Sequence, residues 1–204
     1  FSSVDGVTWV LAAVLPSGAG DAALSPVCLA VDVLTGELVI VYNLSDGSVQ
    51  LTTYDPETGQ WVSVTLDGFV AAGGGFAGGV FWIVTVDGWL LSYADGEWVT
   101  VQIVPIVGET VGGAVAIDGI LYVVLENGEV WTFDGEVWAL LDTRDAGATV
   151  VLAGDDGLVI VYADDGTADT YTPGDGWVTA DITSDATPDE WVYYDGDLYV
   201  ITDD

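Results

Sequence analysis

The chain has no histidine, no lysine and no methionine, and Arg144 is its only basic residue. Without histidine, neither Ser-His-Asp nor Cys-His catalysis is possible, and a histidine-ligated zinc site is excluded. Without lysine, the chain can form no Schiff base and no phosphate-binding P-loop. The single cysteine, Cys28, excludes an internal disulfide and a cysteine-based metal cluster. Cys28 lies in an apolar run, so we expect a buried and inert thiol and no cofactor.

The charge of the chain is almost entirely of one sign. One basic and 33 acidic residues give a formal net charge of −32, whereas a small soluble domain usually carries a charge of magnitude about 2 to 8. Such a chain repels polyanions and anionic membranes and lacks the cations that nucleic-acid binding requires. No uncharged apolar run approaches the ~18 residues of a membrane span. We therefore expect a soluble protein with no nucleic-acid partner and no membrane partner.

Two residue markers recur along the chain with nearly the same period. The first is a tryptophan that follows an aromatic residue or valine and a tight-turn signal, at Trp9, Trp61, Trp98, Trp138 and Trp177. The second is a glycine that precedes a continuous apolar run, at Gly36, Gly79, Gly119, Gly157 and Gly196. When each series is continued from the C-terminus to the N-terminus, its five steps total the 204 residues of the chain. A shared period of about 41 residues indicates a repeat architecture.

Each repeat reads as four short strands. A small apolar strand is followed by a β-branched and aromatic strand without alternation, which must be covered on both faces. Asp-Gly or Asn-Gly turns, the residues that two-residue hairpins need, lead into the third strand, and the fourth strand carries the tryptophan. No helical periodicity is present. The predicted fold is all-β, a five-bladed β-propeller of four-stranded antiparallel blades.

The predicted propeller is a single domain, 1–204, whose last blade is split between the chain ends. N-terminal strands pair there with C-terminal strands, which leaves no open edge between the first and last blades. The region 15–26 is a linker, or alternatively a loop that covers one mouth of the central channel. The expected boundaries are 1–14 for the outer strands of blade five, 15–26 for the linker, 27–68, 69–104, 105–143 and 144–183 for blades one to four, and 184–204 for the inner strands of blade five.

The segments 112–141 and 36–64 resemble kelch repeats. The shared pattern is an apolar strand, Asp-Gly, an apolar strand containing tyrosine, and then an aromatic residue, aspartate, a turn and tryptophan. The resemblance implies a propeller fold and carries no catalytic residue to this chain. A large ring at one place in each blade favours packing between blades over sugar stacking.

Candidate site residues lie on the expected inner strands or on the loops that lead into them. The carboxylates among them are Asp32, Glu109, Asp145, Asp189 and Glu190. Trp191 and Tyr193 are the aromatic candidates for the channel, and Arg144 is expected to form local ion pairs with Asp142 and Asp145 or to face the channel. Converging carboxylates could act as an acid/base pair on a glycan or hold Ca²⁺. No spacing singles out a pair and no calcium loop is present, so we assign no catalytic residue and no metal ligand.

The leading hypothesis is a non-enzymatic propeller scaffold or binding module, monomeric and without an evident evolved ligand. The alternatives are a propeller that binds or hydrolyses glycans and one that binds divalent cations. A designed sequence would explain the regular repeats, the Asp-Gly turns and the absent residue types together. A halophilic or secreted natural protein is the alternative origin, and the sequence does not indicate a cellular location.

Overall fold

The computed structural model describes residues 24–31, 37–94, 97–148, 150–153, 157–162, 166–182, 190–194 and 197–201. It divides the chain into two compact units, Phe1–Gly68 and Phe69–Asp204, which we treat separately. Every described element is a strand except one 3-10 turn, η1 (Val104–Ile106). Over these ranges, no helix is long and apolar enough to cross a membrane.

The first unit contains repeat 1, an antiparallel sheet in the order β1-β2-β3-β4. Its strands are β1 (Leu24–Val31), β2 (Leu38–Leu44), β3 (Ser48–Asp55) and β4 (Gln60–Asp67). Strand β1 begins three residues inside the segment predicted as a linker, with a bulge between Pro26 and Cys28. Burial raises the pKa of the Cys28 thiol to about 12, which agrees with an inert cysteine.

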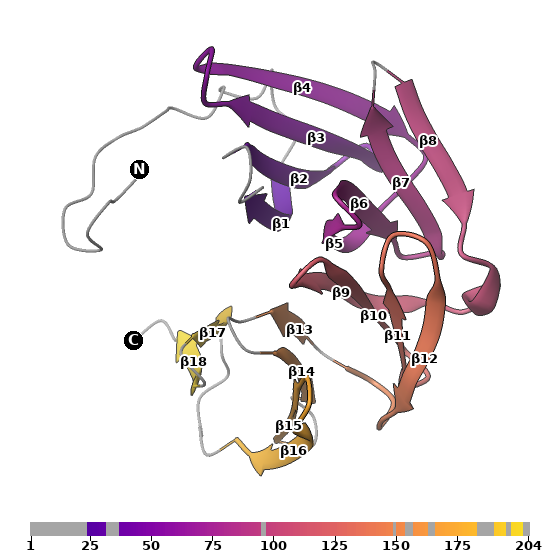
Figure 1. The fold of residues 1–204 in the computed structure, drawn as a ribbon, viewed down its shortest axis with the longest axis vertical. Helices are drawn as coiled ribbons and strands as arrows, with labels where there is room; N and C mark the ends of the chain where they lie inside the picture. The colour runs from indigo at the N-terminus through magenta and orange to yellow at the C-terminus, as the bar shows by residue number, and fades with distance from the viewer. Residues whose placement is uncertain are drawn as a thin grey trace. The chain divides into compact units, whose positions relative to one another are not determined.

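The second unit contains three more four-stranded repeats and a final strand pair (Figure 1). Repeat 2 comprises β5 (Ala71–Ala77), β6 (Val80–Thr85), β7 (Trp89–Ala94) and β8 (Glu97–Gln102). Repeat 3 comprises β9 (Val111–Ile117), β10 (Ile120–Leu125), β11 (Glu129–Phe133) and β12 (Trp138–Thr143). Repeat 4 comprises β13 (Val150–Ala153), β14 (Leu158–Tyr162), β15 (Thr167–Thr172) and β16 (Gly176–Asp181). The final pair is β17 (Glu190–Tyr194) and β18 (Asp197–Ile201).

The second strands of repeats 3 and 4 are buried on both faces, as their unbroken apolar runs predict. In β10, Leu121 and Val123 pack with residues of repeat 2, whereas Tyr122 and Val124 pack with residues of repeat 4. The same alternation holds in β14, where Val159 packs on the side of β18. Neighbouring repeats therefore provide the cover that helices provide for a parallel sheet.

The first strands of successive repeats approach one another closely. Strands β5 and β9 pair in parallel, Gly73 with Ala114 and Gly74 with Val115, and so join repeats 2 and 3 into one eight-stranded sheet. The prediction treated each blade as a separate sheet, so this pairing is new. A Cβ atom at Gly73 would overlap the carbonyl oxygen of Ala114, and one at Gly113 would lie 2.7 Å from the Cβ of Val151. Small residues thus permit contact between backbones at this point.

The repeat markers match the structure wherever it describes them. The turn glycines between the second and third strands have positive φ, at Gly47, Gly88, Gly128 and Gly166. Gly79 and Gly119 also have positive φ, while Gly157 lies where a Cβ would overlap the carbonyl oxygen of Tyr171. The markers Trp9, Gly36 and Gly196 lie outside the described residues. The number of blades and the joining of the chain ends stay predictions.

The close approach of β5 and β9 can be tested at one glycine. Gly73→Ala would place a methyl group on the Ala114 backbone, so we expect a loss of about 3 kcal/mol or more in the free energy of unfolding. Gly112→Ala is the matched control, because its Cβ would meet nothing closer than 3.5 Å. Chemical denaturation measures both variants. Equal losses in the two would contradict the backbone contact.

Candidate functional site

The chain's only arginine is paired with a deeply buried carboxylate. Arg144 follows β12, and its Nε donates a 2.9 Å hydrogen bond to Oδ2 of Asp169 on β15, which also lies 2.8 Å from the arginine NH2. The side chain of Asp169 is only 2% exposed. The hydroxyl of Thr179, its cross-strand neighbour on β16, donates to the other carboxylate oxygen. The pair therefore ties repeat 3 to repeat 4.

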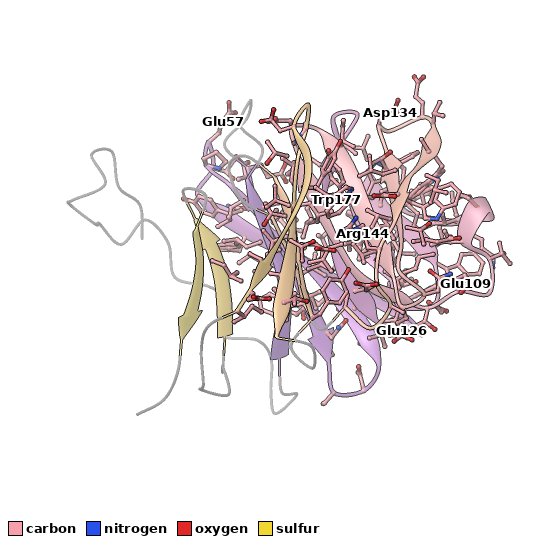
Figure 2. The ribbon with its side chains drawn as sticks, turned by 90° about the horizontal axis from the view of Figure 1, so that it is seen from below. Glu57, Glu109, Glu126, Asp134, Arg144 and Trp177 are labelled. Atoms are coloured by element: carbon pink, nitrogen blue, oxygen red, sulfur yellow. The ribbon has the colours of Figure 1, made fainter. Side chains whose placement is uncertain are left out.

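Two further groups hold the guanidinium of Arg144. Its central carbon lies 4.7 Å from the ring centroid of Trp177, and the two residues lie side by side in Figure 2. Its NH1 lies 3.5 Å from a carboxylate oxygen of Asp142, one of the two predicted local partners. Burial alone would lower the pKa of Arg144, but the hydrogen bond and charge of Asp169 outweigh it and raise that pKa. The guanidinium thus stays charged and keeps its donors on Asp169 and Asp142.

Arg144 occupies a position at which the flanking repeats carry isoleucine. In repeats 2, 3 and 4 the residue just after the fourth strand donates its backbone N–H to the carbonyl of the turn glycine. These bonds are Ile103 to Gly88 at 3.0 Å, Arg144 to Gly128 at 2.7 Å and Ile182 to Gly166 at 2.7 Å. Ile103 is 1% exposed within the core between repeats 2 and 3. A charged pair in repeats 3 and 4 has therefore replaced an apolar contact.

Tyr162 adds a buried hydroxyl beside this pair. It ends β14 at 3% exposure, and its Oη has no hydrogen-bond partner among the described residues. Burial raises the pKa of Tyr162 to about 12, and the charge of Asp169 acts in the same direction. The tyrosine therefore stays neutral at physiological pH.

The Arg144 cluster has structural rather than catalytic chemistry. The buried carboxylate is paired with the arginine and accepts a hydrogen bond from the threonine, so both of its oxygens are already engaged. No three metal-ligating side chains gather within the part of the chain that the structure describes. What the geometry supplies is a polar contact between two neighbouring repeats, and such contacts can specify which surfaces pair.

Of the predicted site residues, the structure describes the side chains of Glu109, Arg144 and Asp145. Glu109, in the loop before β9, accepts a 3.2 Å hydrogen bond from Asn127, and both residues are exposed. Asp145 is exposed in the loop after β12. Asp32 and Asp189 lie outside the described residues. The backbone of Glu190, Trp191 and Tyr193 pairs with β18, but their side chains lie outside the described part of the chain.

Most described turn acids are exposed and serve the turns themselves. Asp55 accepts hydrogen bonds from the backbone N–H groups of Glu57 and Thr58, and Asp134 from those of Glu136 and Val137. The Thr58 hydroxyl and backbone bonds lower the pKa of Asp55, and backbone bonds lower that of Asp134. The labelled acids Asp134 and Glu126 lie at opposite ends of the second unit (Figure 2). This arrangement agrees with an acidic coat rather than one acidic patch.

The repeat tryptophans pack against aromatic partners in every repeat that the structure describes. Each lies directly across the hairpin from an aromatic residue at or next to the end of the third strand. The pairs are Tyr54–Trp61, Tyr93–Trp98, Phe133–Trp138 and Tyr171–Trp177, with ring centroids 4.6–5.3 Å apart. Trp138 and Trp177 also pack on the cores between repeats. Their geometry favours the packing interpretation over a row of sugar-stacking platforms.

Sequence reasoning missed Asp169, Trp177 and Tyr162 as neighbours of Arg144. The prediction gave the arginine only partners adjacent in sequence, Asp142 and Asp145. A signal for Asp169 was present, since an aspartate between alanine and threonine in the middle of a strand is costly unless it is paired. With one cation in the chain, Arg144 was its only possible charged partner.

Arg144→Ile should leave the buried carboxylate of Asp169 without its charged partner. We expect a loss of about 3–5 kcal/mol in the free energy of unfolding at pH 7, because one member of a buried pair is removed. The double variant Arg144→Ile/Asp169→Leu should lie within about 1 kcal/mol of the parent or above it, because apolar residues can replace such a pair. Urea denaturation of the two single variants and the double variant completes the cycle. If the losses of the two single substitutions simply add in the double variant, the two residues are not coupled.

Tyr162 should make the protein sensitive to alkaline pH. Its folded pKa of about 12 lies above the ordinary value of 10.0, so the unfolded chain releases the phenolic proton first as pH rises. Stability is then fully present below pH 10 and falls between pH 10 and 12. Tyr162→Phe should reduce that fall, because it removes the phenol whose pKa differs between the folded and unfolded chains. Denaturation at several alkaline pH values measures the free energy of unfolding of both proteins. The same slope against pH in Tyr162→Phe and in the parent would disprove the assignment.

Comparison with known proteins finds likeness in structure alone. No protein-family model and no curated protein matches the chain. Streptogramin B lyase aligns with a TM-score of 0.59 at 15% identity, over 78% of this chain and 55% of its own. PorZ, a surface component of the type-IX secretion system of Porphyromonas gingivalis, aligns with a TM-score of 0.51 at 13% identity, over 78% of this chain and 27% of its own.

This chain thus spans about half the length of streptogramin B lyase and about a quarter of that of PorZ. Both neighbours are β-propeller-like, and identities this low concern the fold and not the activity. The chain has an all-β, β-propeller-like fold.

Proposed function

We propose that the chain is a non-enzymatic β-propeller module that serves as a scaffold or binds a partner on its outer surface. The observation that supports this proposal is the composition of the described first strands of repeats 2, 3 and 4. Every residue of β5, β9 and β13 is glycine or apolar. In a propeller these strands lie nearest the axis, where a catalytic group would stand.

The described acids also fit a non-enzymatic module. Glycoside hydrolysis requires two carboxyl groups about 5 to 9.5 Å apart across the scissile bond. The acids at Asp55 and Asp134 instead bond to their own turns, and the buried Asp169 is neutralised by Arg144. No feature of the described residues favours a glycan or a divalent cation as ligand.

The finer architecture belongs to the same proposal. The module has five kelch-like blades, and the fifth is assembled from residues 1–14 and 184–204. The two marker series support this count, because each marker occurs five times along the chain. The regular turns and the absent residue types support a designed or strongly idealised sequence over a halophilic or secreted natural one.

A substrate panel tests the proposal directly. We expect the full chain to hydrolyse none of a set of aryl glycosides and to melt at the same temperature in Ca²⁺ and in EDTA. The chain would be a glycosidase if it hydrolysed a glycoside and this activity were lost in Glu190→Gln but kept in Asp134→Asn. A higher melting temperature in Ca²⁺ would make it a cation-binding module. Either result replaces the proposal.

A further inference from the structure

The outer strand β8 presents an open and uncharged edge. It is the last strand of the eight-stranded sheet in the second unit, and no described strand pairs with its far side. The four residues 99–102 are all exposed and uncharged. Val99 and Val101 lie on one face of the strand at 45% and 50% exposure. Edges of this kind are ready acceptors for an added strand.

The hydrogen-bonding pattern shows which amides face that edge. The N–H of Ile103 bonds inward to the carbonyl of Gly88, at the pair that follows Trp89–Gln102 in the β7–β8 register. Bonded and non-bonded pairs alternate along an antiparallel ladder. Val101 and Val99 therefore bond inward to β7, while the N–H groups of Gln102 and Thr100 point to the open edge.

The other outer strands are less suited to take a new strand. Strand β16 lies beside Arg144, whose guanidinium rests on Trp177. Strand β12 is interrupted by a register shift opposite Val130 and Trp131. In β4 only Val62 is strongly exposed, whereas Val64 and Leu66 on the same face are half-buried. Among the fourth strands that the structure describes, β8 alone combines an uninterrupted ladder with two exposed valines on one face.

Charge decides what kind of chain would occupy the edge. One exposed carboxylate, Glu97, lies at the start of β8, whereas that of Asp87 accepts a hydrogen bond from the Thr85 hydroxyl of β6, on the far side of β7 from this edge. A second copy of this chain would bring another formal charge of −32, which opposes association at moderate ionic strength. A cationic segment would be attracted to the acidic surface and paired with Glu97 at the start of the strand.

We propose that the outer edge of β8 binds an extended peptide segment of alternating apolar and basic residues by β-strand addition. This inference rests on the proposed function as a binding module and names the partner's chemistry. The peptide backbone bonds to the amides of Thr100 and Gln102, and its apolar side chains cover Val99 and Val101. A lysine or arginine side chain of the peptide lies near Glu97.

The test uses the full chain and a synthetic alternating Lys-Val peptide of about eight residues, a length that covers one strand. In NMR titration we expect the amide signals of Thr100 and Gln102 to shift and their hydrogen exchange to slow. Thr100→Pro removes an edge amide without removing a bond to β7, so the affinity should fall at least tenfold. Thr100→Val is the matched control and should bind as the parent does.

Peptide controls keep the test valid even if Thr100→Pro fails to fold. On the parent chain, a peptide with the same composition and a central proline should bind at least tenfold more weakly. Equal binding of this peptide would overturn the proposal, because the acidic surface alone would then hold it. Binding of a Glu-Val peptide, or dimerisation of the chain through Thr100 and Gln102, would overturn the basic partner. None of these results produces glycoside turnover, so failure here is distinct from failure of the proposed function.

Discussion

The structure depends on burial of one strand type from both sides. A run such as that of β10 or β14 cannot be covered by its own sheet, so each repeat is stable only against its neighbours. Two features of the sequence follow from this requirement. The strands on which repeats meet contain glycine and alanine where backbones touch, and the repeat tryptophans close the hairpins that border the cores. Both are consequences of packing and neither requires a ligand.

Much of this fold was predictable, because the same pattern of strands and turns occurs several times along the chain. A single turn such as that at Gly128 predicts little by itself. Because the same turn recurs at Gly47, Gly88 and Gly166, the ends of the second and third strands could be predicted. The start of β1 was missed because Pro26 signals a loop, whereas the structure accommodates it beside a bulge. The parallel pairing of β5 with β9 was missed because pattern analysis sees only neighbours within a repeat.

The candidate site was less predictable, since it exists where the repetition fails. Arg144 stands at a position that is isoleucine in repeats 2 and 4, and it needs a compensating change in the next repeat, at Asp169. The two residues lie 25 positions apart in sequence, so local reasoning assigned Arg144 to the adjacent Asp142 and Asp145. Comparison of equivalent positions between repeats would have exposed both departures together. In a repeat protein, paired departures from the pattern indicate specific contacts.

The acidic composition fits the same physical constraint at the outer strands. Packing of one repeat on the next buries the second strand of each, but it leaves the fourth strand with an open side. Natural sheets often protect such edges with lysine or proline, which β8 lacks. The high negative net charge can protect the edge from a distance. It opposes the approach of a second copy although residues 99–102 themselves carry no charge. Protection of this kind is selective, since it discourages like chains and favours a basic one.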